Sequence, residues 1–239
     1  MPQSNKKKLS VCIPTYEMQG EAKRMLVRSF AMLKKQTFKD FEVVISDNSE
    51  NQVVKDLCKE PEYQSLQINY FKNPRKGMAP NTNEAIKNAK GEIIKILYMD
   101  DYLANENSLQ RIVGNMKGHW LVTGCEHDDG AKRGNPHYPQ YNNKIHQGKN
   151  TIGSPSVLTI KNENPLLFDE KMTWLLDCDY YERMHEKYGE PNILNEINVV
   201  IGIGSHQVTN ILSNSAKKKE RHYMAKKYKK GPWHWFKFW

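Results

Sequence analysis

Two adjacent carboxylates, Asp100 and Asp101, follow directly on the apolar run at residues 91–99, GEIIKILYM. An aliphatic and β-branched run of this kind is typical of a strand that is buried on both faces of a parallel sheet. We therefore place both acids at the carboxyl end of a strand, which is the edge where open α/β sheets bind ligands. Two hard oxygen donors side by side suit a divalent cation that carries a diphosphate. The pattern predicts a nucleotide-sugar site.

Composition limits the class of protein. The chain has 239 residues, 38% of them hydrophobic, which is enough for a real core, and a formal net charge of +9. Its four cysteines, Cys12, Cys58, Cys125 and Cys178, lie far apart without a CxxC pair, which predicts reduced thiols in a cytosolic protein. No run approaches the ~20 apolar residues that span a bilayer. We expect a cytoplasmic protein, with peripheral association at the inner face of a membrane as an option.

Strands and helices alternate before the two acids. The alternation predicts an α/β fold, a three-layer domain with a mostly parallel central sheet, in which the polar ends of the strands share one edge. Apolar runs and helical spacing predict strands at 9–14, 41–46 and 66–71, and helices at 22–35, 53–59 and about 85–89.

The pattern becomes less regular after Asp101. Residues 126–149 are polar, and we interpret them as a long loop whose Tyr138 and Tyr141 belong to an acceptor-binding lid. The remaining predicted elements are helices at 108–116 and 177–188 and strands at 120–123, 156–160 and 198–203. We divide the chain into one catalytic domain at 1–212, with a nucleotide-binding half at about 9–103 and an acceptor half at about 104–212, and a basic, aromatic tail at 213–239.

The tail combines Lys and Arg residues on a helix-like stretch with the aromatic sequence WHWFKFW at 233–239. Basic and aromatic residues together are typical of an anchor on an anionic membrane surface. The same mixture could bind nucleic acid through phosphate contacts and stacking, a partner that we disfavour. A third interpretation is a solvated helix whose aromatic residues pack back on the core.

Several stretches resemble the nucleotide-binding half of the family 2 glycosyltransferases. They are LSVCIPTYE from Leu9, FEVVISDNSE from Phe41 and NPRKGMAPNTNEAIKNAKGEIIKILYMDDYL from Asn73, and the likeness returns at FDEKMTWLLDCDYYERM from Phe168. The resemblance implies a glycosyltransferase-A fold, a UDP-sugar donor, Mn²⁺ or Mg²⁺ as cofactor, and inversion at the anomeric carbon. The acceptor would be a saccharide or a glycolipid.

The resemblance also implies which residues bind the donor. The family usually has Asp-any-Asp where this chain has Tyr98 before Asp100 and Asp101, which leaves open which acid binds the ion. An imidazole can complete a metal shell otherwise made of oxygen, and His206 follows the last predicted strand. The implied nucleotide contacts are Pro14, Thr15, Tyr16, Glu17, Asp47, Lys76, Gly77 and Asp100, and the implied metal ligands are Asp100 and Asp101. His206 is added as a candidate metal ligand from its position, with a surface histidine as the alternative.

An inverting transfer needs a general base for the acceptor hydroxyl. Asp177 matches the catalytic acid of the family near a helix start, with Asp179 as the reserve on the acceptor side. Trp174 could stack on an acceptor sugar, although an Asp at a helix start is often only a cap and a tryptophan is often core. The alternative function is a non-catalytic nucleotide- or nucleic-acid-binding module on the same α/β scaffold. The chain has neither GxGxxG nor GxxxxGK.

Overall fold

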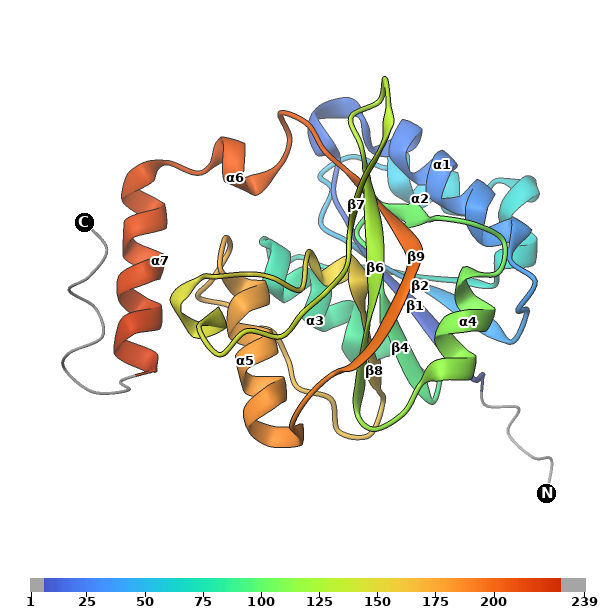
Figure 1. Ribbon diagram of the computed structural model, residues 1–239. Coiled ribbons are helices and arrows are strands. Elements are labelled where there is room, and N and C mark those ends of the chain that lie inside the picture. Colours follow the sequence, from blue (N-terminus) through green and yellow to red (C-terminus); the bar gives the residue numbers. More distant parts are fainter. Residues whose placement is uncertain (1–6, 229–239) are drawn as a thin grey trace.

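A mixed sheet with helices on both faces forms the body of the protein in the computed structural model, which describes residues 7–228 (Figure 1). Within these residues the strand order is β3-β2-β1-β4-β8-β6-β9-β5, with β7 paired to β6. The strands are β1 (Leu9–Thr15), β2 (Phe41–Asp47), β3 (Ile68–Lys72), β4 (Ile93–Ile96), β5 (Tyr102–Leu103), β6 (Trp120–Asp128), β7 (Arg133–His137), β8 (Leu158–Lys161) and β9 (Asn192–Gly202).

The helices form two outer layers. Figure 1 shows α1, α2 and α4 on one side of the sheet and α3 and α5 on the other, with α7 outside α5. The predicted three-layer α/β arrangement is therefore confirmed. The α-helices are α1 (Ala22–Lys35), α2 (Val53–Lys59), α3 (Met78–Asn88), α4 (Ser108–Asn115), α5 (Leu176–Tyr188), α6 (Val208–Ile211) and α7 (Asn214–Lys227).

The first half of the sheet is parallel. β1 pairs with both β2 and β4, and β2 pairs with β3, all in parallel. Every position of β1 and β2 is buried, as the uninterrupted apolar runs predict. The register sets Thr15 opposite Asp47 and Asp47 opposite Lys72, so the strands end at one level. The parallel pairing brings the polar residues that follow each strand to one edge.

The second half of the sheet is mixed. β8 is antiparallel to β4 and β6, while β9 is parallel to β6 and antiparallel to β5. The prediction of a continuous loop at 126–149 is wrong, because β6 continues to Asp128 and forms a hairpin with β7. β7 has the sequence RGNPH and no buried residue, so it carries no apolar pattern. β9 likewise starts at Asn192, six residues before the predicted strand. Its first half is mostly exposed and therefore lacks the apolar pattern on which the prediction depended.

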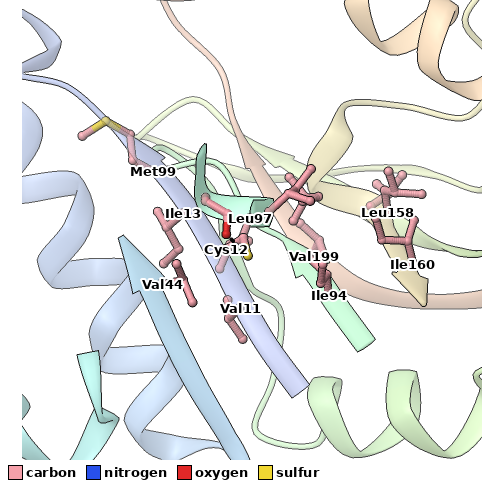
Figure 2. Close-up of a cluster of buried hydrophobic side chains, with 14 of the residues drawn as sticks. Val11, Cys12, Ile13, Val44, Ile94, Leu97, Met99, Leu158, Ile160 and Val199 are labelled. Carbon is pink, nitrogen blue, oxygen red and sulfur yellow. Dashed lines mark hydrogen bonds between the residues drawn. The ribbon is translucent and has the colours of Figure 1, made fainter. Parts of the chain in front are cut away.

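The core extends through both halves of the sheet and the helices that cover it. Figure 2 shows Val11 and Ile13 of β1, Ile94 of β4, Ile160 of β8 and Val199 of β9 among its buried side chains. These five side chains are 1% exposed or less. Burying a side chain of this size contributes about 1.5–3 kcal/mol. The strands that end at the polar edge are therefore held in place by a buried core.

Helix α3 begins earlier than the apolar pattern predicts. Its first two turns contain buried polar residues rather than apolar ones. Asn81 donates from Nδ2 to the carbonyl oxygen of Thr15 at 2.8 Å, and Asn83 donates from Nδ2 to the carbonyl oxygen of Phe168 at 2.9 Å. A hydrogen-bonded polar face can be buried at little cost, although its composition is typical of a loop. This face ties α3 to both halves of the molecule.

Helix α7 contacts the body through its middle and through its last turn. Ser213 caps its start, at the predicted boundary of the tail, by accepting from the amide of Ala216 at 3.2 Å. At the other end, Lys227 Nζ lies 2.6 Å from Asp179 and 2.7 Å from Asp169. The helical part of the tail is thus docked, and the aromatic sequence at 233–239 lies outside the described residues.

Two further predictions concern the whole chain. No helix within residues 7–228 has the length and apolar character needed to cross a membrane. All four cysteines are free thiols, as predicted, and Cys12, Cys125 and Cys178 are buried.

Candidate active site

A cavity of about 590 Å³ lies at the polar edge of the sheet. One wall comes from the segments that follow β1, β2, β3, β4 and β9, and a second wall comes from residues 148–155 and 173–178. The predicted site residues that line it are Pro14, Tyr16, Glu17, Lys76, Gly77, Asp100, Asp101, Trp174, Asp177 and His206. Thr15, Asp47 and Asp179 do not line the cavity.

Asp47 does not line the cavity, although the neighbouring residue does. Its side chain is fully buried, and its Oδ1 accepts from Thr15 Oγ1 at 3.2 Å and from the amide of Ser49 at 2.9 Å. Its Oδ2 accepts from Tyr70 Oη at 2.7 Å. The neighbouring residue Asn48 lines the cavity instead. Sequence reasoning chose Asp47, the first residue of the DNSE stretch, whereas the structure has Asn48 in the lining of the cavity.

Asp100 and His206 form a pair on the cavity wall. Asp100 Oδ2 and His206 Nε2 are 3.0 Å apart, and this hydrogen bond raises the pKa of the His206 imidazole. His206 reaches Asp100 because the chain turns back after β9. Among residues 7–228, no group of three or more His, Cys, Asp or Glu side chains is arranged to hold a metal ion. Asp100 and His206 are two potential metal ligands that this hydrogen bond brings together.

Asp101 is bound by the protein itself. It is 3% exposed, and its Oδ1 accepts from the amide of Gly202 at 2.8 Å. Burial, together with the neighbouring charge of Asp100, raises the pKa of the Asp101 carboxyl. A Cβ atom at Gly202 would lie 2.4 Å from the carbonyl oxygen of Asp100, so only glycine lets β9 approach the two acids this closely. The adjacent acids therefore have different surroundings, and Asp100 is the more accessible.

Asp177 lies on the second wall, in the first turn of α5. Its Oδ2 accepts from Asn150 Nδ2 at 2.7 Å, and its Oδ1 accepts from the amide of Cys178 at 2.7 Å. Burial raises the pKa of the Asp177 carboxyl to about 6. A carboxylate with a pKa near the working pH is suited to general base catalysis. Sequence reasoning missed Asn150, because it lies within a polar stretch that gives no periodic signal.

Asp179 is not part of the site. It is fully buried and binds Arg183 at 2.8 Å, Lys227 at 2.6 Å and Tyr228 Oη at 2.7 Å. Residues two apart on a helix point to different sides, so Asp177 and Asp179 cannot both face the cavity. The assignment of Asp179 to the acceptor is therefore wrong, and its carboxylate instead joins α5 to α7.

The two tyrosines of the predicted lid also lie away from the cavity. The Tyr141 ring stacks on His185 at 3.9 Å, and its hydroxyl donates to Glu182 at 3.0 Å. Tyr138 is exposed. The part of this region that lines the cavity comes later in the chain, at Gly148, Asn150 and Ser154.

Trp174 is half-buried and lines the cavity close to Asp177 in the sequence. Two cations of α7 lie over its ring, Arg221 at 4.9 Å and Lys217 at 5.7 Å from the centroid. A tryptophan ring positioned by cation–π contacts is a suitable platform for stacking on a sugar.

Comparisons with known proteins agree with one another. The family model described as glycosyl transferase family 2 matches residues 10–180. Over 98 residues, 40% of this chain, the sequence is 31% identical to a Campylobacter jejuni protein named GalNAc(5)-diNAcBac-PP-undecaprenol beta-1,3-glucosyltransferase. The chain covers 30% of the length of that protein.

Solved structures share the fold. S. aureus TarS 1-349 superposes with a TM-score of 0.64 at 21% identity, over 82% of this chain and 60% of TarS 1-349. The complex of TarS 1-349 with UDP-GlcNAc gives a TM-score of 0.63 at 20% identity, over 86% and 61% of the two chains. The mannosyltransferase PcManGT from Pyrobaculum calidifontis, in complex with GDP-Man and Mn²⁺, gives 0.62 at 15% identity, over 95% and 66%.

Proposed function

Because this chain belongs to the family 2 glycosyltransferases, we propose that it is an inverting, metal-dependent glycosyltransferase that transfers a hexose or an N-acetylhexosamine from a UDP-sugar. The glycosyltransferase-A type fold that the resemblance implies agrees with the structural neighbours. The observation that carries the proposal is that Asp100, His206 and Asp177 line the same cavity. Donor activation and proton transfer need groups on opposite sides of the reacting carbon.

The donor nucleotide is assigned to the wall built by the strand ends. Tyr16, Glu17 and Pro14 follow or end β1, and Asn48 takes the place that the sequence gave to Asp47. Lys76 is exposed at the rim, where it pairs with Glu50, and it would meet the phosphates as a point charge. TarS structures in complex with UDP and with UDP-GlcNAc are among the fold neighbours, which supports a uridine nucleotide.

Asp100 and His206 would hold the metal ion. The Asp100 carboxylate suits either Mn²⁺ or Mg²⁺, and the His206 imidazole could complete a Mn²⁺ shell, with the remaining positions left to the diphosphate and water. The accessibility of Asp100, compared with the buried Asp101, makes Asp100 the main protein ligand in this proposal. When bound, the ion would neutralise the diphosphate and stabilise the leaving nucleotide. The Mn²⁺ complex of PcManGT supports this assignment.

Asp177 is assigned as the general base. Its carboxylate removes the proton from the acceptor hydroxyl while the hydroxyl oxygen forms a bond to the anomeric carbon and the bond to the diphosphate breaks. The sugar inverts because the nucleophile and the leaving group occupy opposite faces. Asn150 and the amide of Cys178 orient the carboxylate, and Trp174 would stack on the acceptor sugar.

The acceptor is proposed to be a saccharide or a lipid-linked saccharide. The name of the Campylobacter jejuni relative includes an undecaprenol-linked diphosphate, which supports a glycolipid. The outer face of α7 exposes Lys219, His222 and Lys226, which suits an anionic membrane surface and supports a proposed location at the inner, cytoplasmic face. Reversing the charge of Lys219 and Lys226 should weaken sedimentation with phosphatidylglycerol vesicles about fivefold per residue. Unchanged sedimentation would reject the membrane contact.

Calorimetric titration of the protein with a panel of UDP-sugars, first with Mn²⁺ and then with chelator, tests the function. We expect one UDP-sugar to bind in the presence of the ion and to be turned over when acceptors are added. A folded protein that binds none of them would contradict the proposal, and binding without turnover would favour the alternative of a non-catalytic nucleotide-binding module.

A further inference from the structure

Glu220 of α7 makes an unusual set of contacts with the acceptor wall. Its Oε1 accepts from the amide of Thr173 at 2.9 Å, and its Oε2 accepts from the amides of Trp174 at 2.8 Å and Leu175 at 2.9 Å. These three consecutive amides belong to a segment 45 to 47 residues earlier in the chain. One carboxylate on a C-terminal helix therefore satisfies the backbone of the segment that leads into α5.

The segment needs such a partner. The amides that precede and begin a helix have no acceptor within the helix. Leu175 is the N-cap residue of α5, and its apolar side chain makes no capping hydrogen bond. A carboxylate at this end of the helix also interacts favourably with the helix dipole, and hydrogen bonds to a charged acceptor are stronger than neutral ones. Glu220 thus supplies from α7 a charged acceptor for the amide of the N-cap residue and for the two amides before it.

The neighbours of Glu220 on α7 strengthen this interpretation. Lys217, Lys219 and Arg221 surround it in the sequence, yet within residues 7–228 Glu220 forms no ion pair and directs its carboxylate to the backbone amides. Lys217 and Arg221 lie over the ring of Trp174 at the same time. One face of α7 therefore contacts both the backbone and the side chain of the residue that lines the cavity.

We propose that Glu220 is a positioning residue that fixes the segment 173–175, and through it Trp174 and Asp177, for the acceptor. The inference rests on the proposed function for its catalytic consequence. Glu220 touches no reacting atom and does not line the cavity. Its removal should leave the donor wall intact and loosen the acceptor wall, so acceptor use should suffer while donor affinity does not.

The test compares wild-type protein with Glu220→Gln, Glu220→Ala and the control Glu186→Gln. Glu186 is an exposed glutamate on α5, so its substitution removes the same charge without touching the segment. Helix α7 should stay docked in the Glu220 variants, because Lys227 and Tyr228 still bind Asp179. Circular dichroism and calorimetry with the UDP-sugar and Mn²⁺ should therefore give wild-type results for all variants.

Hydrogen exchange gives the first readout. Amides 173–175 should exchange about tenfold faster in Glu220→Ala, with a smaller increase in Glu220→Gln, because each loses charged hydrogen bonds. The exchange rates of the α7 amides should not change in the Glu220 variants, and the exchange rates of amides 173–175 should not change in the control variant Glu186→Gln. Unchanged exchange at 173–175 would overturn the inference, and so would faster exchange throughout α7, because the helix would then have detached.

Transfer kinetics give the second readout. With a synthetic undecyl-diphosphate-linked GalNAc saccharide as the acceptor probe, the acceptor KM should rise about tenfold in Glu220→Ala and less in Glu220→Gln, while the donor KM stays constant. A change in both KM values, or in neither, would overturn the positioning role. If the wild-type protein bound no UDP-sugar, the proposed function would fail, and the exchange measurement would still decide whether Glu220 holds the segment.

Discussion

The two walls of the cavity are held in place by different means. The donor wall consists of residues that end or follow parallel strands, and those strands pair in register over a fully buried core. The acceptor wall consists of irregular segments at 148–155 and 173–175 and the first turn of α5. Single side chains hold it, with Asn150 on Asp177 and Glu220 on the amides before α5.

Because the two walls are held differently, substitutions in them should affect stability and turnover to different degrees. A change that disturbs the donor wall disturbs the sheet on which the whole domain depends. The polar side chains of the acceptor wall can change while the sheet remains, because they lie outside the strands, whereas its buried residues Ile152, Leu175 and Leu176 belong to the core. We therefore expect substitutions on the acceptor wall to affect turnover more than stability, and the following experiments examine that contrast.

The largest effect is expected for Asp177→Asn. An amide cannot accept the proton of the acceptor hydroxyl, so kcat should fall by about 10²–10⁴-fold. Donor affinity, measured by calorimetry with Mn²⁺, should stay at the wild-type value because the donor wall is untouched. Normal turnover in this variant would remove Asp177 as the base and would leave the acceptor wall without a catalytic group.

A smaller effect is expected for Asp100→Asn on the donor wall. Loss of the charged ligand should weaken Mn²⁺-dependent binding of the UDP-sugar by about 10–100-fold. Asp101→Asn should preserve more of the metal dependence, because Asp101 mainly accepts the amide of Gly202. If both variants bound the donor as the wild type does, the metal assignment would be wrong.

Asp177 and Asp179 offer a comparison of stability within one helix. Asp179→Asn should lower the free energy of unfolding by about 2–3 kcal/mol, since Lys227 and Arg183 lose a buried partner. Asp177→Asn should leave the free energy of unfolding unchanged or raise it by about 1 kcal/mol at pH 8. The sign follows from the pKa of about 6, because burial disfavours the charged form above that pH. Urea unfolding of both variants measures the difference, and equal losses would contradict the division between site and scaffold.

The smallest expected effect is a shift in the pH profile. Asp177 must be ionised to act as a base, so kcat should fall as the pH drops through about 6. The hydrogen bond from Asn150 lowers the pKa of Asp177, so Asn150→Ala should move the acidic limb to higher pH. A pH series with saturating substrates measures both, and a limb that moves to lower pH in the variant would reject this role for Asn150.

The same contrast explains what the sequence could predict. On the donor wall the polar clusters follow apolar strands, so Asp100 could be chosen from its position, whereas Tyr16 and Lys76 were assigned through the resemblance to a family. Asp47 was assigned in place of Asn48, because the direction of a side chain at a strand end depends on local backbone geometry. Glu220 was invisible, since its contacts join an irregular segment to a helix about 45 residues away. Asp177 could be identified only through the resemblance to a family.

Gly202 has a consequence for the evolution of the enzyme. Glycine has no side chain that could contact a substrate, yet any Cβ atom at position 202 would collide with the carbonyl oxygen of Asp100. A larger residue would have to push β9 away from the two acids, and it would carry His206 with it. A saturation library at position 202, selected for transfer, should therefore return glycine almost alone. Tolerance to mutation at this site would be set by the space between two strand ends.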